Sequence, residues 1–204
     1  IANNAGSIGT LNIGAGAGDP AAAPGTLRVQ RVRFGDGTGT INFNHTSDDY
    51  VFAPAISGNG SVNVLAGTTI FTGANTYTGA TGVTNGILRA GAADAFSAAS
   101  SHAVAARATL DTGGFNQHLA SLANSGTVSL VGANAGSTLT LTGPYVGHAG
   151  VLRLGTGLPA IDRLVLDGAS ATATGTTSVQ IATRGGLGAQ TTGNGIEVIS
   201  ARNG

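Results

Sequence analysis

The chain has 204 residues, of which 9% are charged, and its nine basic residues balance nine acidic ones. Zero net charge without any lysine argues against a nucleic-acid binder, which needs a basic surface. The absence of cysteine excludes a disulfide scaffold, an iron–sulfur site and a thiolate zinc site, and no apolar run approaches the roughly 18 residues of a membrane-spanning helix.

The composition favours short strands joined by tight turns. Glycine contributes 35 residues, and the β-branched residues Val, Ile and Thr are abundant. Disordered chains are poor in β-branched residues and rich in charge, so disorder does not fit. β-Branched residues suit pleated strands, and Gly and Asn suit turns.

Short segments that alternate apolar and polar residues recur along the whole chain. Alternation with a period of two places one face of a strand inward and the other toward water. An Ala-rich stretch at 90–108 favours helix by composition, but it lacks an apolar stripe of helical period, so we expect mostly loop there. The alternating segments are 11–13, 27–29, 41–43, 62–64, 70–71, 87–89, 108–110, 128–130, 139–141, 151–154, 164–166, 179–181 and 196–198.

This pattern predicts an all-β protein, a right-handed parallel β-helix with about 20 residues per coil and eight to ten coils. A sandwich or barrel is the alternative, but these segments are shorter than typical sandwich strands of about five to six residues. One coil cannot bury its own inner face, whereas stacked coils bury a continuous apolar column. The tail from about Thr142 has longer strands, and we interpret it as a C-terminal capping subdomain.

Residues 56–91 read ISGNGSVNVLAGTTIFTGANTYTGATGVTNGILRAG. This segment resembles the passenger-associated repeat of bacterial autotransporters, a type V secretion family, through its Gly-Thr-Thr strand at 67–69, its TGANTYTG core at 72–79 and the final segment 86–91. The tail resembles the pertactin-like C-terminal end of passenger domains through residues 145–147, 162–164, 185–189 and 192–196. We therefore divide the chain into β-helix coils at 1–138 and a pertactin-like cap, or autochaperone region, at 139–204.

The resemblance implies a route through the periplasm and across the outer membrane. The partners that it implies are the protein's own C-terminal translocator β-barrel and the outer-membrane assembly machinery, with a host-cell surface or matrix as a further partner. The product would be displayed on the bacterial surface or secreted, and its C-terminal end would fold first as a template for the preceding coils. We expect a leader before Ile1 and a translocator barrel after Gly204.

We predict no catalytic residue, no cofactor and no metal site. Residues 35–39 have a weak likeness to calcium-binding solenoid turns, and 14–18 to a phosphate loop, but both lack the required context. We expect a solvated loop rather than a calcium site at Asp48 and Asp49. The four histidines show no metal-ligand spacing, and we expect surface or turn positions for His45, His102, His118 and His148.

Two sets of residues leave a binding alternative open. We interpret the arginines 28, 31, 33 and 89 as solvated side chains rather than a heparin- or lipid-binding patch, and Tyr77 and Tyr145 as packing residues rather than ligand contacts. An adhesive function would use the irregular segments 19–24, 46–54 and 91–102. A polysaccharide-active enzyme is the less favoured alternative, because such sites need clustered carboxylates and the acidic residues here are scattered.

Overall fold

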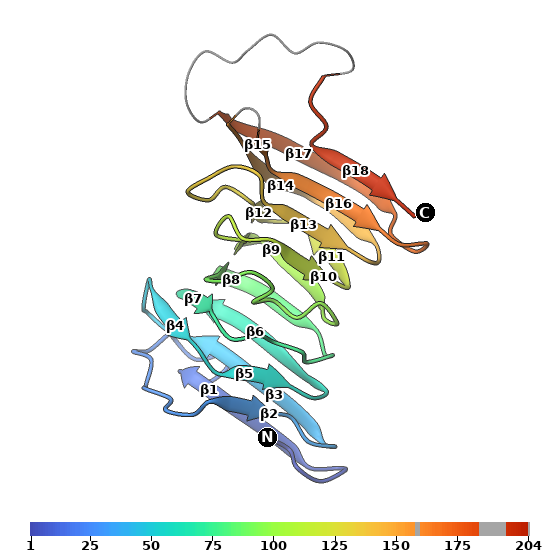
Figure 1. The fold of residues 1–204 in the computed structure, drawn as a ribbon. Helices are drawn as coiled ribbons and strands as arrows, with labels where there is room; N and C mark the ends of the chain where they lie inside the picture. Colours follow the sequence, from blue (N-terminus) through green and yellow to red (C-terminus); the bar gives the residue numbers. More distant parts are fainter. Residues whose placement is uncertain (158–159, 184–194, 204) are drawn as a thin grey trace.

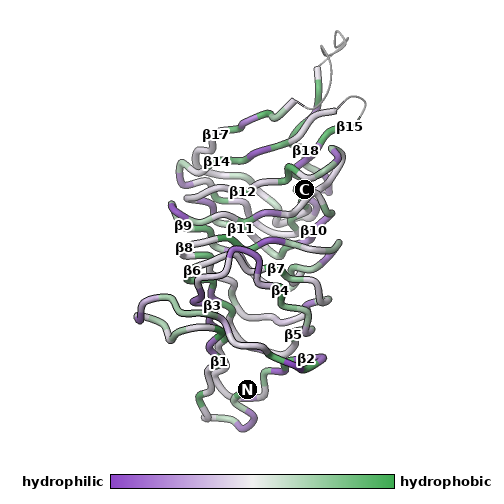
Figure 2. Tube along the Cα trace, turned by 90° about the vertical axis from the view of Figure 1, so that its left-hand side faces the viewer, coloured by the Kyte–Doolittle hydropathy of each residue, from purple (hydrophilic) through white to green (hydrophobic). Residues whose placement is uncertain are grey.

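The computed structural model describes residues 1–157, 160–183 and 195–203, which form a β-solenoid with the two termini at opposite ends (Figure 1). This part of the chain contains eighteen strands and no helix. Figure 2 shows the coils stacked along one axis. None of the described residues belongs to a helix that could cross a membrane.

Consecutive coils lie in parallel register along the largest sheet. The seven steps of one column advance by 30, 21, 19, 21, 20, 23 and 28 residues, a mean of about 23. The predicted parallel β-helix is therefore confirmed, and the middle coils have close to the predicted length. The longer first and last steps leave about seven coils rather than eight to ten. The residues of this column are Leu11, Ile41, Val62, Thr81, His102, Leu122, Tyr145 and Ala173.

Each coil has three faces, which we number in chain order from β1. The first face contains β1 (Ile8–Gly14), β3 (Thr38–Asn44), β6 (Gly60–Ala66) and β11 (Ser121–Asn124), and the second contains β4 (Tyr50–Phe52), β7 (Thr68–Phe71) and β12 (Thr127–Ser129). Four longer strands run across both faces: β8 (Thr81–Ala90), β9 (Ser101–Asp111), β14 (Tyr145–Gly157) and β17 (Ala173–Thr183).

The third face closes the coil. It is formed by β2 (Arg31–Arg33), β5 (Ala55–Ser57), β10 (Gln117–Leu119), β13 (Thr138–Leu141), β16 (Arg163–Asp167) and β18 (Ile199–Arg202). The remaining strand, β15 (Ala160–Ile161), pairs antiparallel with the end of β14. All the other strand pairs between named elements are parallel, which is the pattern of a solenoid rather than a sandwich.

The repeat-like segment 56–91 shows why its polar residues occur at fixed places. The Asn75 side chain accepts a hydrogen bond from the Ile56 backbone N–H at 2.7 Å and donates one to the Ala95 carbonyl at 2.7 Å. It therefore joins β5 to the next two coils, neither of which has a strand on the third face within the described residues. A side chain at Gly79 would collide with the Gly60 carbonyl of the coil below. The asparagine therefore links the coils on the third face, and the glycine lets the chain pass close to the start of β6.

The Ala-rich stretch corrects the sequence prediction. Residues 91–100 form turns, as expected, but 101–111 are the eleven-residue strand β9. His102, Val104, Ala108 and Leu110 of this strand are buried, so inward and outward positions alternate in spite of the helix-favouring composition. Burial between two neighbouring coils outweighs the intrinsic preference of Ala for helix.

Candidate functional site

The C-terminal coils hold the longest continuous ladder of the solenoid. β14 has 13 residues and pairs with β17 at eleven register positions, with one irregularity between His148 and Gly150. On its other side β14 meets β11 and β12 at three positions each. The prediction of longer strands in the tail holds for β14 and β17, with 13 and 11 residues, but not for β15, β16 and β18, with two, five and four. Earlier in the chain β8 and β9 are about as long as β17, with 10 and 11 residues.

A buried carboxylate organises the corner between β15 and β16. Asp162 is fully buried, and its Oδ1 accepts hydrogen bonds from the Gly136 N–H at 2.8 Å, the Ser137 N–H at 2.9 Å and the Ser137 hydroxyl at 3.0 Å. Its Oδ2 accepts one from the Gly155 N–H at 2.7 Å. A buried carboxylate is tolerated where donors satisfy its oxygens, so Asp162 joins the end of β14 to the segment before β13.

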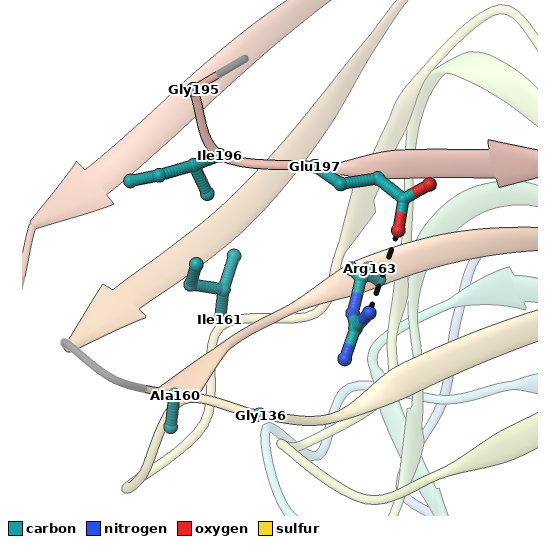
Figure 3. Close-up of a pocket in the computed structure, with 7 residues that line it drawn as sticks. All are labelled: Gly136, Ala160, Ile161, Arg163, Gly195, Ile196 and Glu197. Atoms are coloured by element: carbon teal, nitrogen blue, oxygen red, sulfur yellow. Dashed lines mark ion pairs between the residues drawn. The ribbon is translucent and has the colours of Figure 1, made fainter. Parts of the chain in front are cut away.

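A shallow cavity of about 360 Å³ lies beside this corner (Figure 3). Ile161 and Ile196 point into it from two neighbouring coils, and Arg163 reaches toward Glu197, with Nη1 3.6 Å from the carboxylate oxygen. The Arg163 and Glu197 side chains are 40% and 57% exposed, so solvent screens the pair and it adds little to stability. The cavity belongs to the packing of the last coil on the one before it.

Tyr145 fixes the corner at the start of β14. Its side chain is 5% exposed, and its hydroxyl lies 2.8 Å from the Thr177 hydroxyl and 3.4 Å from Asn124 Nδ2. Asn124 also donates to the Val151 carbonyl at 3.2 Å and accepts from the Gly126 N–H at 3.1 Å. The packing interpretation of Tyr145 is confirmed, because the side chain ties together three successive coils.

Tyr77 makes the corresponding contact in the repeat-like segment. It is completely buried, and its hydroxyl lies 2.6 Å from that of Thr81, which in turn lies 2.8 Å from that of Ser100. Burial raises the pKa of Tyr77 to about 12. The side chain is therefore a core residue, as expected.

The inward-facing apolar side chains are buried in most coils but exposed to solvent in the last described coil. Leu152, Leu154 and Leu164 are at most 1% exposed, whereas their register partners Val179, Ile181 and Ile199 are 42%, 49% and 43% exposed. These inward positions are thus apolar in both coils, but among the described residues only those of the earlier coil lie between two neighbouring coils. The last coil presents an apolar surface in line with the core.

The prediction of surface or turn positions is wrong for two of the four histidines. His45 and His102 lie in the core, at 0% and 2% exposure, rather than at surface or turn positions. His45 Nε2 lies 2.9 Å from the Thr69 hydroxyl, and His102 Nδ1 lies 3.1 Å from the Ser100 carbonyl. Burial lowers the pKa of His102 to about 4 and also lowers that of His45, so both rings are neutral near pH 7.

The other two histidines are exposed, as expected. His118 Nδ1 lies 2.6 Å from the Asp94 carboxylate, and both side chains are open to solvent. His148 is exposed on β14. Within the described ranges, no three His, Cys, Asp or Glu side chains gather as they would around a metal ion.

The two glycine-rich segments form hydrogen bonds to neighbouring parts of the fold. In residues 35–39, the Gly35 and Gly37 N–H groups donate to the carbonyls of Ile1 and Ala2, so this segment holds the N-terminal residues against β3. In residues 14–18, the Gly16 carbonyl accepts a hydrogen bond from Asn44 Nδ2 at 2.7 Å. Asp48 and Asp49 lie on an exposed bend.

The arginines do not form one stripe. Arg31 and Arg33 flank the inward Val32 on the third face, and Arg28 is exposed just before them. Arg89 belongs to the second face, where its Nε donates to Asp111 at 2.8 Å. This in-register pair was not anticipated, because its partners are 22 residues apart in sequence and only the coil length brings them together.

The three segments proposed as adhesive loops differ in accessibility. Residues 19–24 are exposed or half-exposed throughout, whereas 46–54 include the strand β4 and 91–102 contribute Ala95, Phe96 and Ser97 to the buried interior. The signature segments 185–189 and 192–194 lie outside the described residues. Gly195 and Ile196, which complete the second signature, line the cavity of Figure 3.

These features define a class of protein: a parallel β-solenoid whose C-terminal coils contain a long ladder across two faces and a buried carboxylate at a corner. Residues 117–204 match the family described as Autochaperone Domain Type 1. The C-terminal part of the chain, from residue 117 onward, is thus an autochaperone region of the kind that autotransporter passengers carry. The family match begins 22 residues before position 139, at the start of β10.

The chain also resembles curated proteins, one of which is named as an autotransporter. The chain is 32% identical over 156 residues to the uncharacterized lipoprotein YdeK of Escherichia coli (strain K12), a match that covers 72% of this chain and 11% of that protein. It is 32% identical over 166 residues to the uncharacterized protein YuaQ of the same strain, covering 79% and 12%. It is 46% identical over 72 residues to the adhesin BmaC autotransporter of Brucella suis biovar 1 (strain 1330), covering 35% and 2%. The chain spans about a tenth of the length of the first two relatives.

Proposed function

We propose that the C-terminal region of this passenger, residues 139–204, folds first, nucleates the coils before it and supports their export across the outer membrane. The observation that carries this proposal is the eleven-position ladder between β14 and β17. Long-range register is costly to establish in a solenoid, and coils added later need to pair only with a neighbour already in place.

The proposed order of folding follows from the asymmetry around β14. The ladder toward β17 is continuous apart from one irregularity, whereas the pairs toward β11 and β12 comprise three positions each. The hydrogen bonds of Asp162 join Gly155 of the C-terminal region to Gly136 and Ser137, which lie just before residue 139 and inside the family match. A C-terminal unit that forms early would then offer the edge of β14 to the preceding coil.

The proposed partners and location follow from the family. During export the passenger would contact its own translocator and the outer-membrane assembly machinery, after passing through the periplasm. It would then be displayed at the bacterial surface or secreted. We propose a non-enzymatic role, with 1–138 as the β-helix rod and 139–204 as the cap. An assay of polysaccharide cleavage that detected turnover would contradict this role.

The test removes residues 139–204 from the full-length protein and measures display on intact cells by antibody binding and by resistance to added protease. We expect folded, surface-displayed passenger to fall strongly. Asp162→Ala should lower it partially, whereas Asp49→Ala, a change at an exposed bend, should leave it unaltered. Unchanged display and unchanged protease resistance after the deletion would refute the proposal.

A second candidate function is adhesion through side loops. The relative named as an adhesin favours it, and so does the exposed segment 19–24. That segment is held on the rod, because Asn44 Nδ2 donates to the Asp19 carbonyl at 2.9 Å. Saturable binding of the chain to host cells or matrix, lost when 19–24 is replaced by Gly and Ser, would support it, and binding no higher than background would exclude it.

A further inference from the structure

A polar groove of about 430 Å³ crosses the outer side of the second face, along the solenoid axis. Its floor is a column of residues in direct register, one from each of five successive coils. The register spaces them by about 4.8 Å, the distance between neighbouring strands. The residues of this column, in order, are Arg89, Asp111, Ser129, Arg153 and Gln180.

Two guanidinium groups in the column are available to a ligand. Asp111 accepts from Arg89 Nε at 2.8 Å, which fixes that side chain while it stays 41% exposed. Among the described residues Arg89 has no further partner for its terminal nitrogens, and Arg153 is exposed without an ion pair or side-chain hydrogen bond. Arg89 and Arg153 lie three rungs apart, or about 14 Å at the spacing between strands.

Hydroxyl groups line the groove between the two arginines. Ser129 lies on the floor at 7% exposure, and Thr109 and Thr127 stand beside it in the adjacent column. A hydroxyl both donates and accepts hydrogen bonds, as the hydroxyl groups of a sugar do. The groove therefore places groups suited to sugar hydroxyls between two guanidinium groups, and its one carboxylate, that of Asp111, is occupied by Arg89.

The geometry points to an acidic polysaccharide as the ligand of this groove, with its chain along the solenoid axis and carboxylate groups bound to Arg89 and Arg153. One rung of about 4.8 Å is close to the length of one sugar unit in an extended chain, so carboxylates three units apart meet the two arginines. A planar guanidinium binds a carboxylate through two parallel hydrogen bonds.

Other polymers fit the groove less well. A peptide strand cannot add to the sheet here, because β9 and β14 are already paired with coils on both sides. A nucleic acid needs many cations along its backbone, and this column has two, one of them held by Asp111. The inference concerns a ligand of the finished rod and is independent of the folding role proposed above.

The test measures binding of a fluorescent oligogalacturonate to the 204-residue chain by anisotropy, at low and at physiological salt. We expect saturable binding that Arg153→Gln weakens about tenfold and that the double variant Arg89→Gln/Arg153→Gln abolishes. Arg31→Gln, which removes an exposed arginine from the third face, is the matched control and should bind like the parent. Thermal unfolding checks that Arg153→Gln is folded, as expected for a side chain without a partner.

Three results would overturn the assignment. The first is the absence of saturable binding, and the second is a loss in Arg31→Gln as large as that in Arg153→Gln, which would indicate nonspecific attraction. The third is equal or tighter binding of polyglutamate or of a single-stranded oligonucleotide of the same charge. A carboxyl-reduced, neutral form of the same sugar chain should bind at least tenfold more weakly.

Discussion

The coils at the two ends of this solenoid bury different kinds of side chain. All six phenylalanines lie before residue 117, and so do the two buried histidines. The autochaperone domain instead buries Leu and Val, with Tyr145 as its one aromatic residue, and adds the buried Asp162. The early coils thus depend on ring packing around a neutral imidazole, and the late coils on a long ladder and a satisfied carboxylate. In a solenoid such differences stay local, because each coil contacts only its neighbours.

The largest effect should come from the aromatic cluster of the early coils. Phe43 is fully buried, with its ring centroid 5.1 Å from that of Phe52 and 5.5 Å from that of Phe71. We expect Phe43→Ala to lower the free energy of unfolding by about 4 kcal/mol, through lost burial and the cavity left behind. Hydrogen exchange should show the loss in residues 38–71 and not beyond residue 139.

The matched control is Phe115→Ala, which removes a ring that is 41% exposed and should cost less than about 1 kcal/mol. Equal destabilisation by the two substitutions, measured by urea unfolding, would contradict the importance of the cluster. So would a loss of protection spread evenly over all coils.

The counterpart in the late coils is Asp162→Ala. It leaves the buried Ser137 and Gly155 N–H groups and the partly buried Gly136 N–H without their acceptor, whereas the Ser137 hydroxyl keeps the Leu130 carbonyl at 3.1 Å, so we expect a loss of about 3 kcal/mol. Asp162→Asn keeps one acceptor oxygen and should lose about half as much. The measurement is urea unfolding together with hydrogen exchange at residues 136–155, and an unchanged exchange pattern there would refute the role of this carboxylate.

A fall in pH should destabilise the early coils more than the autochaperone domain. For His102 the folded-state pKa of about 4 lies below the unfolded value of 6.5, because burial disfavours the charged ring. Its contribution to stability is therefore present above about pH 6.5 and is lost as the pH falls toward about 4, by roughly 2 kcal/mol at pH 5. The lowered pKa of His45 acts in the same direction. We expect the early coils to open first on acidification.

His102→Leu should remove most of this acid sensitivity, measured as the difference in unfolding free energy between pH 7 and pH 5. His148→Gln, at an exposed position of β14, is the control and should leave the difference intact. If the autochaperone domain lost its exchange protection at a higher pH than the early coils, the comparison between the two regions would be wrong.

The sequence predicted the fold class but not the polar contacts inside the fold. Alternation in segments such as 41–43 and 62–64 identifies inward positions, and their spacing gives the coil length. A coil of the right length does not show which inward positions accept a polar residue. Thr69 meets His45 across 24 residues, and nothing near either of them in sequence indicates the pairing.

Asp162 illustrates the same limit in the late coils. The sequence placed it within a family signature but gave no reason for a carboxylate there. The reason is that its donors come from two separate segments, 136–137 and 155, which converge only when β14 turns back at β15. Likewise, the pair of Arg89 and Asp111 depends on register to within one residue. Contacts between coils depend on the exact number of residues in each coil, and this number ranges from 19 to 30.

The smallest losses of unfolding free energy should come from removing the hydroxyl groups of the two buried tyrosines. Tyr77→Phe removes a hydroxyl whose partner, Thr81, is 1% exposed, so we expect a loss of about 1.5 kcal/mol. Tyr145→Phe should cost about 0.5 kcal/mol, because its nearer partner Thr177 is half-exposed and can bond to water instead, and Asn124 Nδ2 keeps its bond to the Val151 carbonyl. Urea midpoints of the two variants give the comparison. A larger loss of unfolding free energy for Tyr145→Phe than for Tyr77→Phe would contradict this explanation, in which the exposure of the partner hydroxyl sets the cost.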